Sequence, residues 1–167
     1  MSASVTRTLV EQLAELDLKP EDIDIVGVSH FHFDHIAQLP DFPTAKLFIG
    51  KSDWDLLTQS PPPAFVDPTP FAHWISGGGE VEPVARDKDV FGDSSVVMFD
   101  MPGHTPGHHT LLVRLAGMGT VLLTGDQAHF QENYDSEGVP TFNANRADTL
   151  ASFGRFKALA KNLKATV

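Results

Sequence analysis

Four side chains that can bind a metal ion lie within six residues of one another, in the stretch 30–35, which reads HFHFDH. Imidazole and carboxylate groups are among the ligands that zinc accepts in proteins. The stretch directly follows a short apolar run that predicts a buried strand. If the strand continues, His30 and His32 point the same way, because side chains alternate along a strand. This pair suits one Zn²⁺, and Asp34 with His35 in the following turn suits a second.

A second group of histidines lies in the stretch 101–109, MPGHTPGHH, again after a run that predicts a strand. Its two Pro-Gly pairs favour turns and let the backbone pass close to other groups. One histidine of this stretch can complete a three-histidine zinc site, which leaves a fourth position open for water. Each of His108 and His109, taken alone, is better explained by a supporting or exposed position than by ligation.

A Gly-Asp pair at 125–126 ends another apolar run. Alone it is a weak signal, but beside two histidine clusters Asp126 becomes a candidate for a carboxylate that bridges two metal ions. His129 and Tyr134 follow three and eight residues later. Either could contact a substrate, and a plain surface position explains each of them at least as well.

The predicted elements place each motif just past a strand, where α/β proteins usually carry their chemistry. Apolar runs between turn residues predict short strands at 23–28, 45–49, 81–84, 95–100, 110–115 and 120–124, and the start of another at 165–167. Apolar spacings of three and four predict helices at 5–18 and 147–163, and shorter ones at 36–39 and 52–58. We expect Ser52 or Asp53 to cap the helix at 52–58.

Three connecting segments are distinctive. A Gly-Met-Gly sequence predicts a hairpin turn at 117–119, and the segment 126–144 reads as irregular. The stretch 60–79 is rich in proline and glycine, so a surface connection and a substrate-covering loop explain it equally well. Its aromatic rings suit contact with an acyl chain, although ordinary core packing is the favoured explanation. These rings belong to Phe65, Phe71 and Trp74.

Composition excludes several classes of function. The 167 residues include 12 basic and 22 acidic side chains, a net charge of −10, which disfavours binding to a nucleic-acid backbone. The absence of cysteine excludes Cys-based zinc sites and a cysteine nucleophile. No apolar run approaches the ~18–20 residues of a membrane helix. We therefore expect one domain at 1–167, a cytoplasmic location, and neither a nucleic-acid nor a membrane partner.

The three motifs together resemble the metallo-β-lactamase superfamily of binuclear metal hydrolases. The resemblance rests on H-x-H-x-D-H at 30–35, Pro-Gly-His at 102–104 and Gly-Asp at 125–126, in the family's order. The phrases SHFHFDH, MPGHTPGHH and LLTGDQAHF are most similar to the N-acyl homoserine lactonase branch. The resemblance implies an α/β fold, a four-layer αββα sandwich with the metal residues on loops at one edge of the sheets.

The resemblance also implies two zinc ions and a role for each candidate residue. His30, His32 and His104 would hold the first ion. Asp34 and His35 would hold the second, and Asp126 would bridge the two. A metal-bound hydroxide would attack the carbonyl carbon of a small ester or lactone, and Asp34 would carry a proton to the leaving group.

Three departures from the family qualify this picture. The chain begins at a helix that other members precede with further strands, and it ends at Val167, where a strand with one more histidine ligand is expected. At the position where lactonases typically carry a tyrosine, this chain has His129, which can also donate a hydrogen bond to a carbonyl oxygen. The resemblance therefore implies a shortened, incomplete sandwich with a weakened second metal site and poor catalysis. Exposed sheet edges then allow association into a homo-oligomer.

Two alternatives to a lactonase stay open at this point. One is another hydrolase of the superfamily, acting on a thioester, a β-lactam or a phosphoester. The other is a fragment that binds metal but does not turn over.

Overall fold

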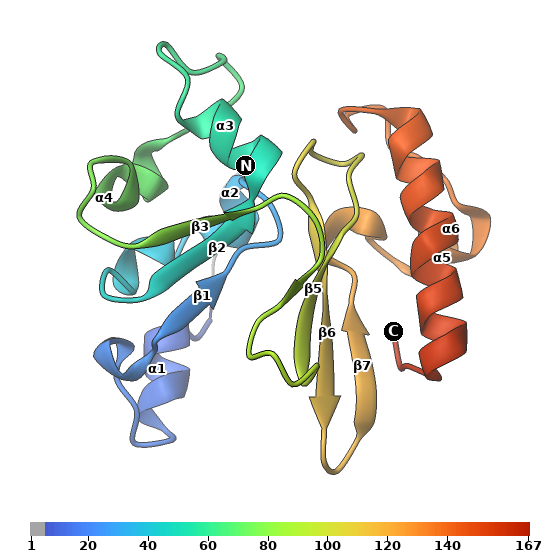
Figure 1. Cartoon of the computed structure of the whole chain (residues 1–167), viewed down its shortest axis with the longest axis horizontal. Helices are drawn as coiled ribbons and strands as arrows, with labels where there is room; N and C mark the ends of the chain where they lie inside the picture. Colours follow the sequence, from blue (N-terminus) through green and yellow to red (C-terminus); the bar gives the residue numbers. More distant parts are fainter. Residues whose placement is uncertain (1–5) are drawn as a thin grey trace.

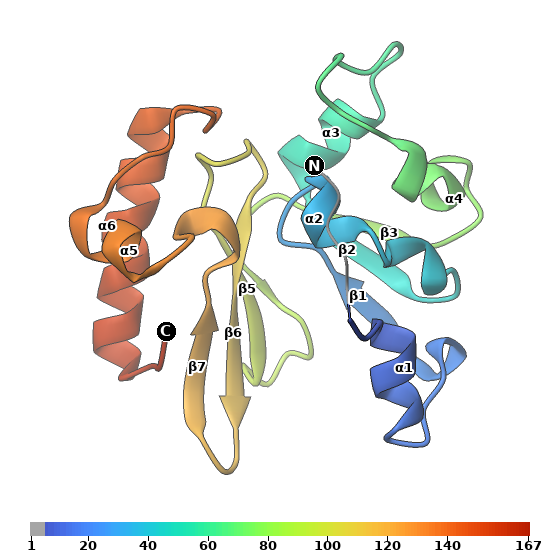
Figure 2. The same cartoon turned by 180° about the vertical axis from the view of Figure 1, so that it is seen from behind.

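The computed structural model describes residues 6–167 and contains two β-sheets that pack against each other, with helices on their outer sides (Figures 1 and 2). The first sheet is parallel, in the order β1-β2-β3. The second is antiparallel and runs β4-β5-β6-β7 in chain order. Their strands are β1 Ile25–Gly27, β2 Lys46–Gly50, β3 Val81–Val84, β4 Lys88–Asp89, β5 Val96–Asp100, β6 His109–Leu115 and β7 Gly119–Leu123.

Alternation along β2 explains how the first sheet packs on both faces. Leu47 and Ile49 belong to the core formed with the helices, whereas Phe48 belongs to a cluster shared with the second sheet. This is the two-residue period of a strand buried on both faces. The helical segments that cover the outer side are α2 Phe33–Ile36, α3 Lys51–Leu57 and α4 Ala72–Ile75, with the 3₁₀ turns Leu39–Asp41 and Thr69–Phe71.

The second sheet is covered by the long helix α6, Arg146–Leu163 (Figure 1). The side chain of Asn145 starts this helix by accepting hydrogen bonds from two backbone amides of its first turn. Phe156 of α6 packs with Leu112 and Leu122, which face each other on β6 and β7. Beyond the helix, Thr166 forms a parallel bridge with Val121 of β7, as the apolar end of the chain predicts.

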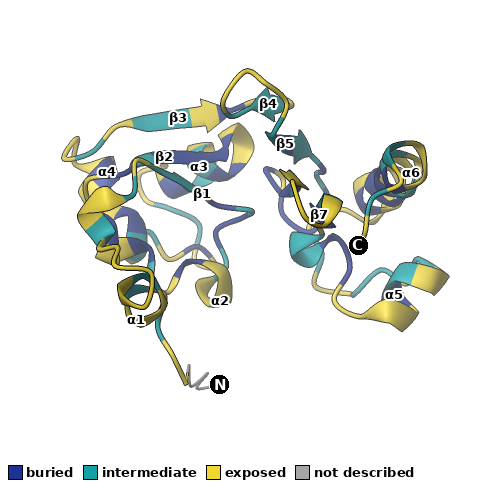
Figure 3. Ribbon diagram, turned by 90° about the horizontal axis from the view of Figure 1, so that it is seen from below, coloured by how far each residue is buried: buried dark blue, intermediate teal, exposed yellow. Residues whose placement is uncertain are grey.

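Three hydrophobic clusters separate four layers of structure. One lies between the first helices and sheet, a small one made of Phe48, Val84 and Met98 joins the two sheets, and the third lies under α6. Figure 3 shows these layers edge-on. The predicted four-layer αββα architecture is therefore confirmed.

Local differences from the prediction have clear causes. Helix α1 spans only Leu9–Ala14, because a capping box between Thr8 and Glu11 starts it and Asp17 turns left-handed with a φ of 57°. The predicted start of this helix at residue 5 lies outside the described residues. The single turn expected at 36–39 lies three residues earlier, as α2. A 3₁₀ turn at Pro20–Asp22 and strand β4 were not predicted.

The two segments predicted to lack regular structure hold short helices. The stretch 60–79 contains α4, and 126–144 contains α5, Gln131–Ser136, after a 3₁₀ turn at Gly125–Gln127. Phe71 and Trp74 are buried in the first core, which confirms core packing for these two rings. Phe65 is 74% exposed, so core packing was the wrong prediction for it.

Within residues 6–167, no helix has both the length and the apolar character that crossing a bilayer requires.

Candidate metal centre

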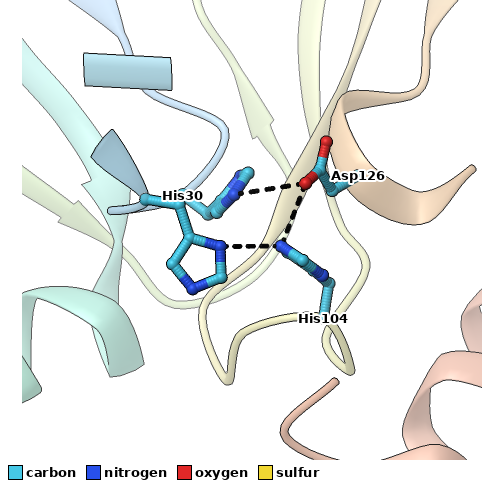
Figure 4. Close-up of side chains that lie close together, drawn as sticks. His30, His104 and Asp126 are labelled. Atoms are coloured by element: carbon cyan, nitrogen blue, oxygen red, sulfur yellow. Dashed lines mark hydrogen bonds and ion pairs between the residues drawn. The ribbon is translucent and has the colours of Figure 1, made fainter. Parts of the chain in front are cut away.

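Side chains from both sheets converge where their strands end. His30 and His32 lie on the loop after β1, His104 on the loop after β5, and Asp126 in the turn after β7. One ligand atom from each lies within 4.8 Å of the ligand atoms of the other three. Figure 4 shows His30, His104 and Asp126 pointing toward one another. The topology thus brings together residues separated by up to 96 positions.

The pairing of His30 with His32 does not arise from a continued strand. Strand β1 ends at Gly27, and the residues up to His32 form a loop that leads into α2. The two imidazole rings still meet edge to face, with centroids 4.7 Å apart. The premise of strand alternation was therefore wrong, although the two side chains are close together.

The spacing of the ligand atoms suits one tetrahedral metal ion. Two ligands held at ~2.0–2.1 Å from a tetrahedral zinc lie about 3.3–3.4 Å apart. His32 Nδ1 lies 2.8 Å from His104 Nε2. Asp126 Oδ2 lies 3.1 Å from His104 Nε2 and 3.7 Å from His30 Nε2. These distances bracket the tetrahedral value, so small movements would accommodate the ion.

One buried nitrogen indicates what this cluster is built to hold. The His30 ring is completely buried, and its Nε2 has no hydrogen-bond partner among the described residues. Its other nitrogen, Nδ1, lies 3.1 Å from the Ser29 hydroxyl. Buried polar atoms without partners are rare because desolvation costs them about 1–3 kcal/mol. A metal ion bound at Nε2 would satisfy this atom, so the donor set fits a metal.

The other two predicted ligands lie on the open side of the cluster. His35 Nε2 lies 3.1 Å from Asp126 Oδ1 and 3.8 Å from Asp34 Oδ2. Asp126 therefore presents one oxygen to His104 and the other to His35, the arrangement of a bridging carboxylate. The side chain of Asp34 is 52% exposed, and both Asp34 and His35 lie on the short helix α2.

The surroundings of His30 and His32 disfavour the protonated form of these two rings. Burial opposes ionisation of Asp126, but the His104 and His35 rings beside its carboxylate hold its pKa well below the usual range. Burial and the neighbouring histidines lower the pKa of His30, and burial with His104 lowers that of His32. The hydrogen bond to Asp126 raises the pKa of His35. The lowered pKa values of His30 and His32 favour neutral rings, whose lone pairs are available as ligands.

Two buried groups hold the ligands in place. His108 accepts a hydrogen bond from the Asp126 amide at its Nε2, 3.0 Å away, and donates from Nδ1 to the Met101 carbonyl, 3.1 Å away. Burial lowers the pKa of His108 to about 3, so the ring stays neutral and can accept this bond. On the other side, His104 Nδ1 donates to Asn143 Oδ1 at 3.1 Å. Such outer partners fix the orientation of metal ligands.

The sequence pointed to a supporting or exposed position for His108 and gave no role to Asn143. A supporting or exposed position was favoured for both His108 and His109, and both are buried. His109 directs its two ring nitrogens at the carbonyl oxygens of Gly107 and Arg86. Asn143 has no local signal, because it lies in a segment that read as irregular.

The two residues considered for substrate contact lie in different environments. His129 is partly exposed, with its Nε2 3.4 Å from Asp126 Oδ2, so it borders the cluster. Tyr134 packs against Phe156 in the core beneath α6 and does not face the cluster. Of these two residues, His129 therefore lies at the cluster and Tyr134 lies in the core.

An apolar cavity of about 260 Å³ opens beside the inner histidines. His32 and His104 form part of its wall, and Phe31 and Leu56 add apolar surface. The exposed rings of Phe65 and Phe142 also line the cavity. A ligand with an apolar portion could therefore place that portion within reach of the cluster.

The cap predicted for α3 is also corrected by the structure. Gly50 occupies the N-cap position, and the helix begins at Lys51, so neither Ser52 nor Asp53 caps it. The Asp53 carboxylate is fully buried and bonds to the loop that carries His104.

Comparison with known proteins agrees with the motifs. The profile of the metallo-beta-lactamase superfamily matches residues 3–163. The N-acyl homoserine lactonase AttM of Rhizobium radiobacter is 31% identical over 95% of this chain and 61% of its own length. An N-acyl homoserine lactonase of a Bacillus species is 29% identical over 95% of this chain and 60% of its own. The chain thus spans about three fifths of the length of these curated relatives.

Solved structures show the same similarity. A quorum-quenching N-acyl homoserine lactone hydrolase superposes with a TM-score of 0.80 and 25% identity, over 95% of this chain and 61% of the other. A hydrolase with the product N-hexanoyl-L-homoserine at its catalytic metal centre gives a TM-score of 0.79 at 25% identity, over 95% and 59% of the two chains. The profile match over nearly the whole chain, with the converging motifs, establishes that this protein belongs to the metallo-β-lactamase superfamily.

Proposed function

We propose that this protein is a zinc-dependent hydrolase that opens the ring of a small lactone, most similar to the N-acyl homoserine lactonases. The observation that carries the proposal is the buried, unpartnered Nε2 of His30, directed at a group of histidine and carboxylate ligands. The similarity to lactonases over 95% of the chain supports the substrate class. The predicted two ions and their identity as zinc are part of the proposal.

In this proposal the cluster divides into two halves that share Asp126. The inner half, His30, His32 and His104, holds the first ion, and the outer half, Asp34 and His35, holds the second. When bound, such ions supply a water that is deprotonated near neutral pH and polarise the carbonyl oxygen. Asp126 orients both halves through its two oxygens, 3.1 Å from His104 Nε2 and from His35 Nε2.

Two further side chains act on the substrate. Asp34 is exposed beside His35 and carries a proton to the departing alkoxide oxygen as the ring opens. His129 donates a ring N–H to the substrate carbonyl oxygen from the edge of the cluster. The apolar cavity beside His32 and His104 takes an acyl chain attached to the lactone.

The proposal is tested by hydrolysis assays on the zinc-loaded chain. We expect N-acyl homoserine lactone to be opened, activity to disappear with a chelator, and His104→Ala to be inactive. His73→Ala is the matched control, because His73 is exposed on α4, away from the cluster. Thioester and β-lactam substrates are run in parallel. Faster turnover of either would overturn the lactone assignment, and metal binding without turnover of any substrate would overturn the enzymatic role.

A further inference from the structure

A carboxylate with no part in the proposed chemistry is buried between the two histidine loops. Asp53 lies on α3, directly after β2 of the first sheet, and its side chain is fully buried. Burying an ionisable group is costly unless it is paired or hydrogen-bonded. The partners of Asp53 therefore indicate why an acid is placed at this position.

Those partners come from the loops that carry the proposed inner ligands. Thr105 donates its hydroxyl hydrogen to Asp53 Oδ2 at 2.7 Å, and the Gly107 amide donates to Oδ1 at 2.7 Å. Burial raises the pKa of Asp53 to about 6, and the backbone amide of Phe31, between His30 and His32, is among the neighbouring groups that oppose this rise. One carboxylate thus holds the loop after β5 by two hydrogen bonds and lies close to the loop after β1.

Backbone packing shows that this junction is close. A Cβ added at Gly107 would meet the Asp53 amide nitrogen at 2.5 Å, and one added at Gly50 would meet the Gly107 carbonyl oxygen at 1.8 Å. Only glycine at both positions allows the turn before α3 to approach the histidine loop so closely. The turn before α3 and the loop after β5 are therefore in direct contact as well as joined by the hydrogen bonds of Asp53.

We infer that Asp53 and Thr105 form a clasp that sets the distance between the His30–His32 loop and the His104 loop, so that the three imidazoles meet at one metal ion. The loops belong to different sheets, which meet at a small cluster of buried apolar residues and at a hydrogen bond from the His109 amide to the Ser29 carbonyl. The clasp supplies a fixed connection between them at the point where the ligands must converge. Asp53 is a positioning residue in this role, and the inference rests on the metal binding proposed above.

The test compares Thr105→Val, which keeps the shape but loses the hydroxyl, with Thr105→Ser, which keeps the hydroxyl. Asp53→Asn tests the carboxylate directly, and Asp55→Asn on the exposed side of α3 is its matched control. Affinity is measured by competition between the chain and a chromophoric chelator for Co²⁺. The visible spectrum of bound Co²⁺ reports ligand geometry, which a general loss of stability would not change.

We expect Thr105→Val and Asp53→Asn to weaken Co²⁺ binding by about 10–100-fold, the usual effect of losing a partner behind the ligands, and to alter the spectrum. Thr105→Ser and Asp55→Asn should match the unsubstituted chain. Unchanged affinity and spectrum in Thr105→Val would overturn the clasp while leaving the metal site intact. Failure of the unsubstituted chain to bind Co²⁺ would instead overturn the proposed function, and the clasp with it. If Asp53→Asn does not fold, the Thr105 pair still decides the question.

Discussion

The inner and outer halves of the candidate metal centre differ in how firmly their ligands are held. The inner rings of His30 and His104 are buried, and each has a partner behind it, the hydroxyl of Ser29 for one and the amide of Asn143 for the other. The outer residues Asp34 and His35 are exposed on a helix of four residues.

This difference teaches that one cluster can combine a fixed site with an adaptable one. The inner ligands lose little conformational freedom when they bind an ion, because the fold has already ordered them. The outer side chains are more exposed, so binding an ion would restrict them more. We therefore expect the first ion to bind more tightly than the second.

Removing an inner ligand should have the largest effect. In His104→Ala the first ion loses one of its three imidazoles, so its affinity should fall by more than about 100-fold, beyond the usual cost of losing an outer partner. Zinc content after gel filtration and chelator competition measure this. Affinity equal to that of the His73→Ala control would show that His104 is not a ligand.

Removing an outer ligand should affect only the second ion. His35→Ala should reduce bound zinc from two ions per chain to one, with the affinity for the first ion unchanged within a few-fold. Isothermal titration with zinc separates the two binding steps. If the affinity for the first zinc ion falls as much as it does in His104→Ala, the inner and outer halves do not bind their ions independently.

Substituting the support beneath the shared ligand should moderately destabilise the metal-free chain, whose fold holds both halves. His108→Leu keeps most of the buried volume but leaves the Asp126 amide and the Met101 carbonyl without partners. Burying such groups unpaired costs about 1–3 kcal/mol in the free energy of unfolding. Urea unfolding of the metal-free chain tests this. A decrease in the free energy of unfolding below about 0.5 kcal/mol, typical of an ordinary surface substitution, would show that His108 does not support Asp126.

The smallest effect on metal binding is expected at His129. Although its Nε2 is 3.4 Å from Asp126, it is the proposed hydrogen-bond donor to the substrate and not a ligand. His129→Leu should keep both zinc ions but slow lactone opening by about 100-fold, the lower range for losing such a donor. Loss of an ion in this variant would place His129 among the ligands instead.

The sequence predicted the proposed ligands better than it predicted the buried residues that hold them in place. The density of ligands at 30–35 is a local signal, and the resemblance of the three motifs to the superfamily supplied His104 and Asp126, which the structure brings close to His30 and His32. The role of Asp53 could not be predicted, since its hydrogen-bond partners lie 52 and 54 residues away. Its position near a helix start suggested a cap, but Gly50 takes that position and the carboxylate turns toward the histidine loop.

The fold shows the same division between local and long-range information. Apolar runs identified six strands, whereas β4 is only two residues long and exists through its pairing with β5. The helices α4 and α5 have four and six residues, too short for a periodic pattern to stand out. Phe65 could not be distinguished from Phe71 because both lie in one proline-rich stretch, and only the tertiary packing buries the second.

The most direct test of the account is anomalous diffraction at the zinc edge from crystals of the chain grown with limiting zinc. We expect one strong peak about 2.0–2.1 Å from His30 Nε2, His32 Nδ1 and His104 Nε2, with a second peak near His35 only at higher zinc concentration. A first peak at Asp34 and His35 with the inner histidines unbound, or no peak at the cluster, would contradict it.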